Sequence, residues 1–141
     1  MAEAFARHYG AGRVEAHSAG MEPTRLKPDA VTAMREVGID ISRQQPKTFD
    51  ETLARRMDDV VTVCGNAHER CPVLPPEVRR LHWPLDDPAR SCGTPEEILA
   101  VFRRSRDGIE TRVRDFIAQI TAADSGRRPG SRPACKAIRQ A

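Results

Sequence analysis

The segment VVTVCGNAHERCPVLPP, residues 60–76, opens on an unbroken run of β-branched residues, Val60-Val61-Thr62-Val63. A run of this kind is typical of a strand that is buried on both faces within a parallel sheet. Cys64 follows the run directly, where the carboxyl ends of parallel strands place ligand sites. The segment therefore predicts both an α/β fold and a candidate site at one edge of its sheet.

The sequence on either side alternates predicted helices with predicted strands. We expect helices over residues 2–9, from Pro28 to the stop at Gly38, from a Thr48–Glu51 capping box to about Met57, and from a Thr94–Glu97 capping box to about Ile120. Short strands are expected over residues 13–18 and 81–83. This alternation predicts one layered α/β domain with a parallel sheet.

Two of these helices have apolar stripes that identify candidate core residues. In the helix that starts at Pro28, the stripe is Val31, Met34 and Val37. In the long last helix, the core face consists of large apolar side chains: Ile98, Val101, Phe102, Ile109, Val113, Phe116, Ile117 and Ile120. We expect both stripes to pack against the sheet.

The basic charge of the chain belongs to its C-terminal end. The 141 residues carry 23 basic and 20 acidic side chains, and residues 121–141 hold five of the basic and one of the acidic ones. A segment rich in Arg, Pro, Gly and Ser cannot bury enough apolar surface to fold by itself. We therefore expect a domain over residues 1–122 and a disordered basic tail over residues 123–141. The tail has no aromatic residue to stack on bases, so nucleic-acid binding is not expected.

The composition indicates a cytoplasmic protein without a membrane partner. Apolar residues make up 39% of the chain and charged residues 30%, and no window approaches the roughly 18 consecutive apolar residues of a membrane span. Glu3, Arg7 and His8 occur where a signal peptide needs an apolar stretch. We also expect the protein to be a monomer.

Cysteines are the first candidates for chemistry. Four of them in such a chain indicate redox, catalytic or metal chemistry rather than a disulfide framework. Cys64 and Cys71 share a short loop, in which two Cα atoms can reach the about 5.5 Å separation of a disulfide. His68 and Arg70 between them favour a thiolate. As a pattern alone, the pair is more typical of two inert thiols. Zinc binding completed by His68, His82 or Cys92 is an alternative that matches no usual ligand spacing.

A second candidate is the Asp86-Asp87-Pro88 turn that follows the last predicted strand. A carboxyl group on a turn at the mouth of a sheet can donate a proton to a leaving oxygen. Taken alone, the motif is more typical of an ordinary Asp-Pro turn.

The order of several segments is more specific than any one motif. In chain order they are HSAG (residues 17–20), EVGIDIS (36–42), VVTVC (60–64), CPVLPP (71–76), LHWPLDDPA (81–89) and FRRSRDGI (102–109). Together they closely resemble the thioredoxin-coupled arsenate reductases, from Met1 to about Ile120. The resemblance implies the low molecular weight phosphatase fold, a three-layer sandwich around a parallel sheet, and reduction of arsenate to arsenite with thioredoxin as reductant. The pair Cys64 and Cys71 distinguishes this group from the ordinary phosphatases of that fold.

The resemblance also implies roles for individual residues. Asp87 matches the general acid that protonates the departing oxygen. Cys64 matches the cysteine that attacks the cysteine–arsenic adduct and releases arsenite, and Cys71 matches the one that then forms a disulfide with Cys64. Glu3 and Ser18 fall at positions that support the phosphate-binding loop.

In some members of the family a potassium ion assists this support, and otherwise no cofactor is expected. Lys47 lies where a cationic side chain could replace that ion. Cys92 and Cys135 match no position of the family pattern, and we interpret them as incidental thiols.

The defining element of the family has no counterpart here. In the family, an internal first strand leads into a C-x-x-x-x-x-R-S loop that binds the oxyanion, and its helix continues with residues like Met1-Ala2-Glu3. Cys64 and Arg70 match the spacing literally, but no helix follows and Arg70 adjoins Cys71, so we interpret this match as coincidence. We therefore expect the chain as given to be inactive and the true start to lie upstream of Met1.

Loss of an internal strand has a structural consequence as well. The strands on either side would have unpaired backbone groups, at a cost on the order of 1–3 kcal/mol for each buried group. We therefore expect the chain to fold poorly, or to rearrange so that its remaining strands pair.

Two alternative functions stay open at this point. One is a phosphatase acting on phosphorylated protein or a small phosphoester. The other is a non-catalytic remnant that binds a partner such as thioredoxin through its cysteine loop.

Overall fold

Helices and strands alternate along the chain, as the sequence predicts. The computed structural model describes residues 1–20, 25–63, 73–124 and 134–139. Its elements are α1 (Ala2–Gly10), β1 (Val14–Ala19), α2 (Pro28–Arg35), α3 (Glu51–Ala54), β2 (Asp59–Thr62), β3 (Arg79–His82), η1 (Pro88–Arg90), α5 (Pro95–Asp124) and β4 (Ala134–Arg139). Each predicted helix and strand up to residue 124 has its counterpart in this list.

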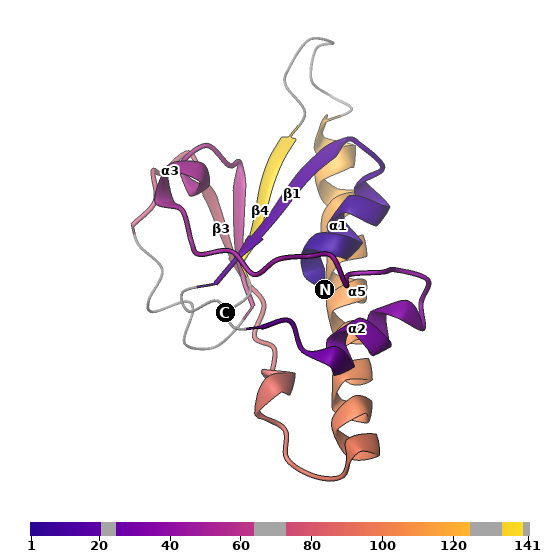
Figure 1. Cartoon of the computed structure of the whole chain (residues 1–141). Helices are drawn as coiled ribbons and strands as arrows, with labels where there is room; N and C mark the ends of the chain where they lie inside the picture. The colour runs from indigo at the N-terminus through magenta and orange to yellow at the C-terminus, as the bar shows by residue number, and fades with distance from the viewer. Residues whose placement is uncertain (21–24, 64–72, 125–133, 140–141) are drawn as a thin grey trace.

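The four strands form one parallel sheet in the order β1-β4-β2-β3 (Figure 1). The last strand in sequence therefore lies inside the sheet, where Ala134 pairs with Val14 of β1 and Lys136 pairs with Asp59 of β2. The prediction of a disordered tail over residues 123–141 is wrong for residues 134–139. Composition describes what a segment does alone, whereas two facing strand edges offer it backbone partners on both sides.

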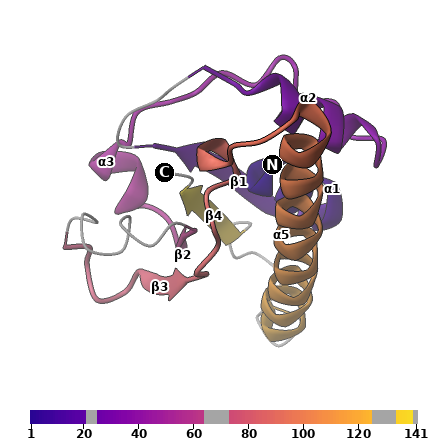
Figure 2. The same cartoon turned by 90° about the horizontal axis from the view of Figure 1, so that it is seen from below.

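Helices cover both faces of the sheet, which confirms the predicted three-layer sandwich. α1, α2 and α5 lie on one face and α3 lies on the other (Figure 2). The predicted strand run divides between these two layers, because successive side chains of a strand point to opposite faces. Val61 and Val63 belong to the larger core beneath α1 and α5, and Val60 packs with Ala54 and Met57 in the smaller one.

The two predicted capping boxes have different outcomes. At the start of α5 the box is confirmed, since the Thr94 N–H donates to Glu97 Oε2 at 2.8 Å and the Glu97 N–H donates to Thr94 Oγ1 at 3.3 Å. At the start of α3 it is wrong, because Asp50 caps the helix by accepting from two backbone N–H groups. Thr48 instead forms a parallel bridge with Gly20. The helix also ends at Ala54, short of the predicted Met57.

The predicted core face of α5 is largely confirmed, while that of α2 is shifted. Of the eight predicted residues in α5, all are buried except the half-buried Ile98 and Val101. In α2 the buried side chains are Ala30, Ala33 and Met34, and Val37 is 40% exposed. The reason is that α2 ends at Arg35, so Val37 no longer follows the helical period.

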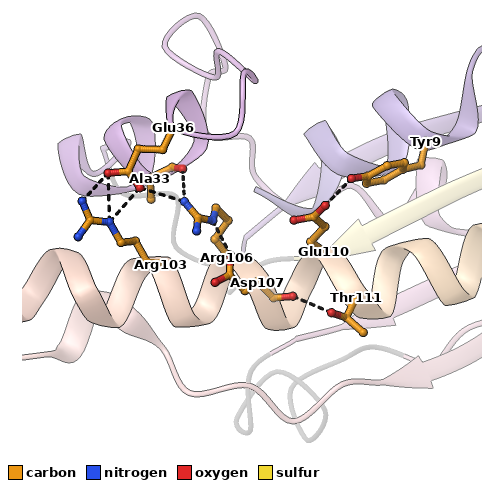
Figure 3. Close-up of polar contacts among 8 residues, drawn as sticks. All are labelled: Tyr9, Ala33, Glu36, Arg103, Arg106, Asp107, Glu110 and Thr111. Atoms are coloured by element: carbon orange, nitrogen blue, oxygen red, sulfur yellow. Dashed lines mark hydrogen bonds and ion pairs between the residues drawn. The ribbon is translucent and has the colours of Figure 1, made fainter.

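Charged side chains fix the end of α2 against α5 (Figure 3). Arg103 Nη2 lies 2.5 Å from Glu36 Oε1, and Arg106 Nη1 donates to Glu36 Oε2 at 3.0 Å and to the Ala33 carbonyl oxygen at 2.8 Å. Arg106 is buried, so it anchors this junction inside the fold. The junction holds α2 in place, and the first turn of α2 lines the pocket described below.

We expect Glu36→Gln to make the stability less sensitive to acid. The hydrogen bond from Arg103 holds the pKa of the Glu36 carboxyl below its usual range. A carboxyl whose pKa is lowered on folding stabilises the protein above its unfolded pKa of about 4.3, and this contribution is lost as the pH falls through the folded pKa. Urea unfolding from pH 6 down to about 3 should therefore show a steeper loss for the wild type than for the variant. Glu96→Gln, on the exposed first turn of α5, serves as the control, and equal pH slopes for wild type and Glu36→Gln would contradict the prediction.

Candidate active site

A pocket of about 200 Å³ opens at the carboxyl edge of the sheet. Its walls are the end of β1, the start of α2, residues 44–47, the residue after β2, the loop after β3 and one face of α5. This is the edge at which the sequence predicted a site. The lining residues include the cationic Arg25, Lys27 and Lys47 and the acidic Asp86 and Asp87. An anion of small size suits such a lining.

A buried carboxylate, Glu3, contacts two residues of the pocket lining, Ser18 and Lys47. It is 3% exposed, it accepts a hydrogen bond from the Ser18 hydroxyl, and its Oε1 lies 2.6 Å from Arg7 Nη2 and 3.7 Å from Lys47 Nζ. Arg7 also donates to the Ala16 carbonyl oxygen of β1. A buried charge is tolerated only when it is paired and hydrogen-bonded. Glu3 therefore ties the first turn of α1 to the end of β1 and to the 44–47 segment.

We expect Glu3→Gln to destabilise the fold by about 1–3 kcal/mol, because an amide cannot satisfy Arg7 and Lys47 as a carboxylate does. The variant keeps the volume of the side chain, so packing is preserved. Glu15→Gln is the matched control, since the Glu15 side chain is 59% exposed and pairs with His17 at the surface. Chemical denaturation of both variants measures the difference. Equal denaturation midpoints for Glu3→Gln and the wild type would show that the pairing of Glu3 contributes nothing to the stability of the fold.

Backbone pairing beyond the end of β1 positions Lys47. The Gly20 N–H donates to the Lys47 carbonyl oxygen at 2.9 Å, and the Phe49 N–H donates to the Gly20 carbonyl oxygen at 2.9 Å. These bonds hold the segment parallel to β1, so that Gln44, Gln45 and Lys47 line the pocket.

A second backbone extension brings Asp87 to the same pocket. After β3, the Trp83 N–H donates to the Thr62 carbonyl oxygen at 2.8 Å and the Leu85 N–H donates to the Val63 carbonyl oxygen at 3.2 Å. Asp87 then caps η1, with its Oδ1 accepting from the Ala89 N–H at 3.0 Å. Asp87 of the Asp-Pro turn thus caps η1 and also lines the pocket.

The predicted relay cysteines, Cys64 and Cys71, lie outside the described residues, as does His68. Val63, which directly precedes Cys64, lines the pocket. Cys92 is exposed and does not belong to that lining. In the part of the chain that the structure describes, no group of three or more His, Cys, Asp or Glu side chains is arranged to hold a metal ion.

The structure brings together Ser18, Lys47 and Asp87 on one pocket, with Glu3 behind Ser18. Sequence reasoning missed Arg7 as the partner of Glu3, although the four-residue spacing on one helix is a usable signal. It also missed Gln44 and Gln45. Their place depends on the Gly20–Thr48 bridge, which has no local sequence signature.

The helices in the described ranges include none with a stretch long and apolar enough for a membrane crossing.

Comparison with known proteins gives a consistent result. The profile of the family described as low molecular weight phosphotyrosine protein phosphatase matches residues 1–125. The chain is 48% identical over 116 residues to an arsenate reductase of Bacillus subtilis (strain 168) and 49% identical over 116 residues to one of Shouchella clausii (strain KSM-K16). Each match covers 82% of this chain and 84% of the relative.

Solved structures agree with this result. An arsenate reductase in the oxidized state superposes with a TM-score of 0.67 at 36% identity, and one in the phosphate binding state superposes with a TM-score of 0.63 at 35% identity. Each covers 84% of this chain and 86% of the solved one. The chain therefore belongs to the low molecular weight phosphotyrosine protein phosphatase family, within the group that contains the arsenate reductases.

Proposed function

We propose that the protein acts in the reduction of arsenate to arsenite, through a thiol relay that thioredoxin recycles. The observation that carries the proposal is the pocket at the carboxyl edge of the sheet, which gathers Ser18, Lys47 and Asp87 beside the residue that precedes Cys64. The cationic side chains of its lining, Arg25, Lys27 and Lys47, suit an oxyanion such as arsenate. The similarity to arsenate reductases over more than four fifths of the chain supports the same reaction.

The proposed reaction has three bond exchanges. A cysteine thiolate attacks arsenate, an S–As bond forms, and the departing oxygen leaves as water after protonation by Asp87. The Cys64 thiolate then attacks the sulfur of that adduct, so that an S–S bond forms and the S–As bond breaks. The bonding pair stays on arsenic, which is thereby reduced from As(V) to As(III) and released as arsenite.

Cys71 completes the cycle in this proposal. Its thiolate attacks the Cys64 sulfur, which releases the first cysteine and leaves a Cys64–Cys71 disulfide. The dithiol of thioredoxin reduces this disulfide and becomes oxidised in turn, so two electrons enter for each arsenite released. Thioredoxin is thus the proposed protein partner, and arsenate is the proposed substrate.

The first nucleophile is the group that these 141 residues do not supply. Apart from Cys64, no cysteine of the sequence has an arginine six positions later, and Arg70 belongs to the relay segment. We infer that the residues present provide the general acid, the relay pair and the support for an oxyanion loop. A strand followed by C-x-x-x-x-x-R must supply the loop itself.

The supporting group around Glu3 does not suit a potassium ion. Glu3 Oε1 already lies 2.6 Å from Arg7 Nη2 and 3.7 Å from Lys47 Nζ, so an ion would bring a third positive charge to one carboxylate. We therefore propose that Lys47 takes the place of the ion and that no cofactor is needed there.

We expect Lys47→Met to create a response to potassium that the wild type lacks. Removing the Lys47 ammonium group leaves space beside the negatively charged carboxylate of Glu3. If the new site binds K⁺ with a Kd of about 10 mM, 100 mM K⁺ stabilises the variant by about 1.4 kcal/mol. The measurement is the Tm in 100 mM KCl against 100 mM choline chloride. Arg43→Met, which removes an exposed cation directly before the 44–47 segment, is the control, and an equal salt response in all three proteins would refute the replacement.

The experiment that tests the proposed function restores the missing element. The chain is fused to the first strand and oxyanion loop of the Bacillus subtilis relative, and arsenate-dependent NADPH oxidation is followed with thioredoxin and thioredoxin reductase. We expect turnover from the fused protein and none from the 141 residues alone. A fused protein that folds but does not turn over would overturn the proposal, whereas turnover by the unfused chain would overturn the inference that an added strand and loop must supply the first nucleophile.

A further inference from the structure

The position between β1 and β2 in the sheet is occupied by β4, which is the last strand of the described sequence. β4 pairs with β1 over six residues and with β2 over four (Figure 1). In the described sheet β4 is the only strand beside β1, and it is what joins β1 to the pair formed by β2 and β3. Without it, β1 and the fully buried strand β2 would face each other across the width of a missing strand.

The path into this position is set by α5. The helix ends at Asp124, and nine residues, 125–133, lead to Ala134. Nine residues can span at most about 30 Å, and the end of α5 and the start of β4 lie at the same end of the molecule in Figure 1. β3, α5 and β4 thereby form an ordinary parallel crossover connection.

The direction of β4 links it to the pocket. Its last residue, Arg139, is in register with Ala19 at the end of β1 and with Thr62 at the end of β2. Ala19 and Val63 line the pocket. A strand in this position therefore delivers whatever follows it to the pocket mouth.

We propose that the gap between β1 and β2 is a strand-accepting site, which residues 134–139 fill in cis and which holds one parallel strand at a time. An internal strand has a neighbour on each side, so two segments cannot occupy the position together. A strand that carries an oxyanion loop into the pocket must then displace β4. This consequence rests on the proposed function, whereas the occupancy by residues 134–139 does not.

Hydrogen exchange of the full chain, followed by mass spectrometry, tests the occupancy. We expect the amides of residues 135–139 to exchange at least about 100-fold more slowly than in an unstructured peptide, together with those of β1. Exchange at the unstructured rate would overturn the proposal. Protection found only in a dimer, and absent from the monomer separated by size, would also overturn it, because the strand would then come from a second copy.

Two single proline substitutions, compared with each other, provide a second test of the occupancy. Every N–H of an internal strand donates to one neighbour or the other, so Ala137→Pro should lower the Tm and speed exchange in β1 and β2. Ser131→Pro, in the connection, should leave both unchanged. An unaltered Tm in Ala137→Pro would contradict the assignment. If this variant does not fold, the exchange pattern of the wild type still decides.

The fused protein tests the displacement. When the added strand enters the sheet, residues 135–139 should lose their protection by about the factor measured in the unfused chain, while β1 keeps its own. Continued protection of residues 135–139 in a fused protein that reduces arsenate would overturn exclusive occupancy. Loss of protection without any arsenate reduction would support the strand site and count against the proposed function alone.

Discussion

We expect Cys71→Ser to abolish thioredoxin-driven arsenate turnover in the fused protein. In the proposed relay, Cys71 is the thiol that frees the first cysteine and creates the disulfide that thioredoxin reduces. A serine hydroxyl cannot attack the Cys64 sulfur, so each chain stops as a mixed disulfide after one arsenite. The steady-state rate should fall by at least about 100-fold, while a burst of one equivalent of arsenite persists.

Cys92→Ser is the matched control for this result. Cys92 is exposed, lies outside the pocket lining and donates a weak hydrogen bond to the Arg90 carbonyl oxygen, so its replacement should leave the rate unchanged. A second measurement is the rate at which the Cys71→Ser variant hydrolyses a small phosphoester. Retained hydrolysis together with lost arsenate turnover would place Cys71 in the relay and not in the oxyanion site. Undiminished steady-state turnover in Cys71→Ser would refute the relay.

Local signals predicted most of the framework correctly. The capping box at Thr94 is encoded within four residues, and the apolar period of α5 within two or three turns, so the helix and its buried face follow from the sequence. The β-branched run at Val60 likewise predicted a strand buried on both faces. Such features depend on residues that are neighbours along the chain, so they can be predicted from the sequence.

Long-range pairing is what the sequence did not disclose. Residues 134–139 form a strand because β1 and β2 present two open edges, and nothing in their own composition indicates this. Thr48 carries a capping signal, yet its backbone is engaged with Gly20, more than 25 residues away, and Asp50 caps the helix instead. The candidate site was predictable where a family pattern fixes a position, as for Glu3 and Ser18, which lie in hydrogen-bond contact. It was not predictable for Gln44 and Gln45, which reach the pocket only through that bridge.

The neighbouring carboxylates Asp86 and Asp87 allow a sharp test of the proposed general acid. Both line the pocket, and Asp87 also caps η1 through its Oδ1. Asparagine is an equally good cap, so Asp87→Asn preserves the turn while removing the proton that the departing oxygen needs.

In the fused protein we expect Asp87→Asn to lower kcat for arsenate by about 10²–10⁴-fold, the usual contribution of a general acid, with little change in KM. Asp86→Asn removes the same charge from the same pocket wall and should lower kcat by less than about threefold. The two substitutions change the electrostatic potential of the pocket alike, so a difference between them reports proton transfer and not charge. Equal losses in both variants would mean that the carboxylates act only through charge, and Asp87 would then have no special role. Thermal unfolding of each variant, expected to match the parent, ensures that the comparison concerns chemistry rather than folding.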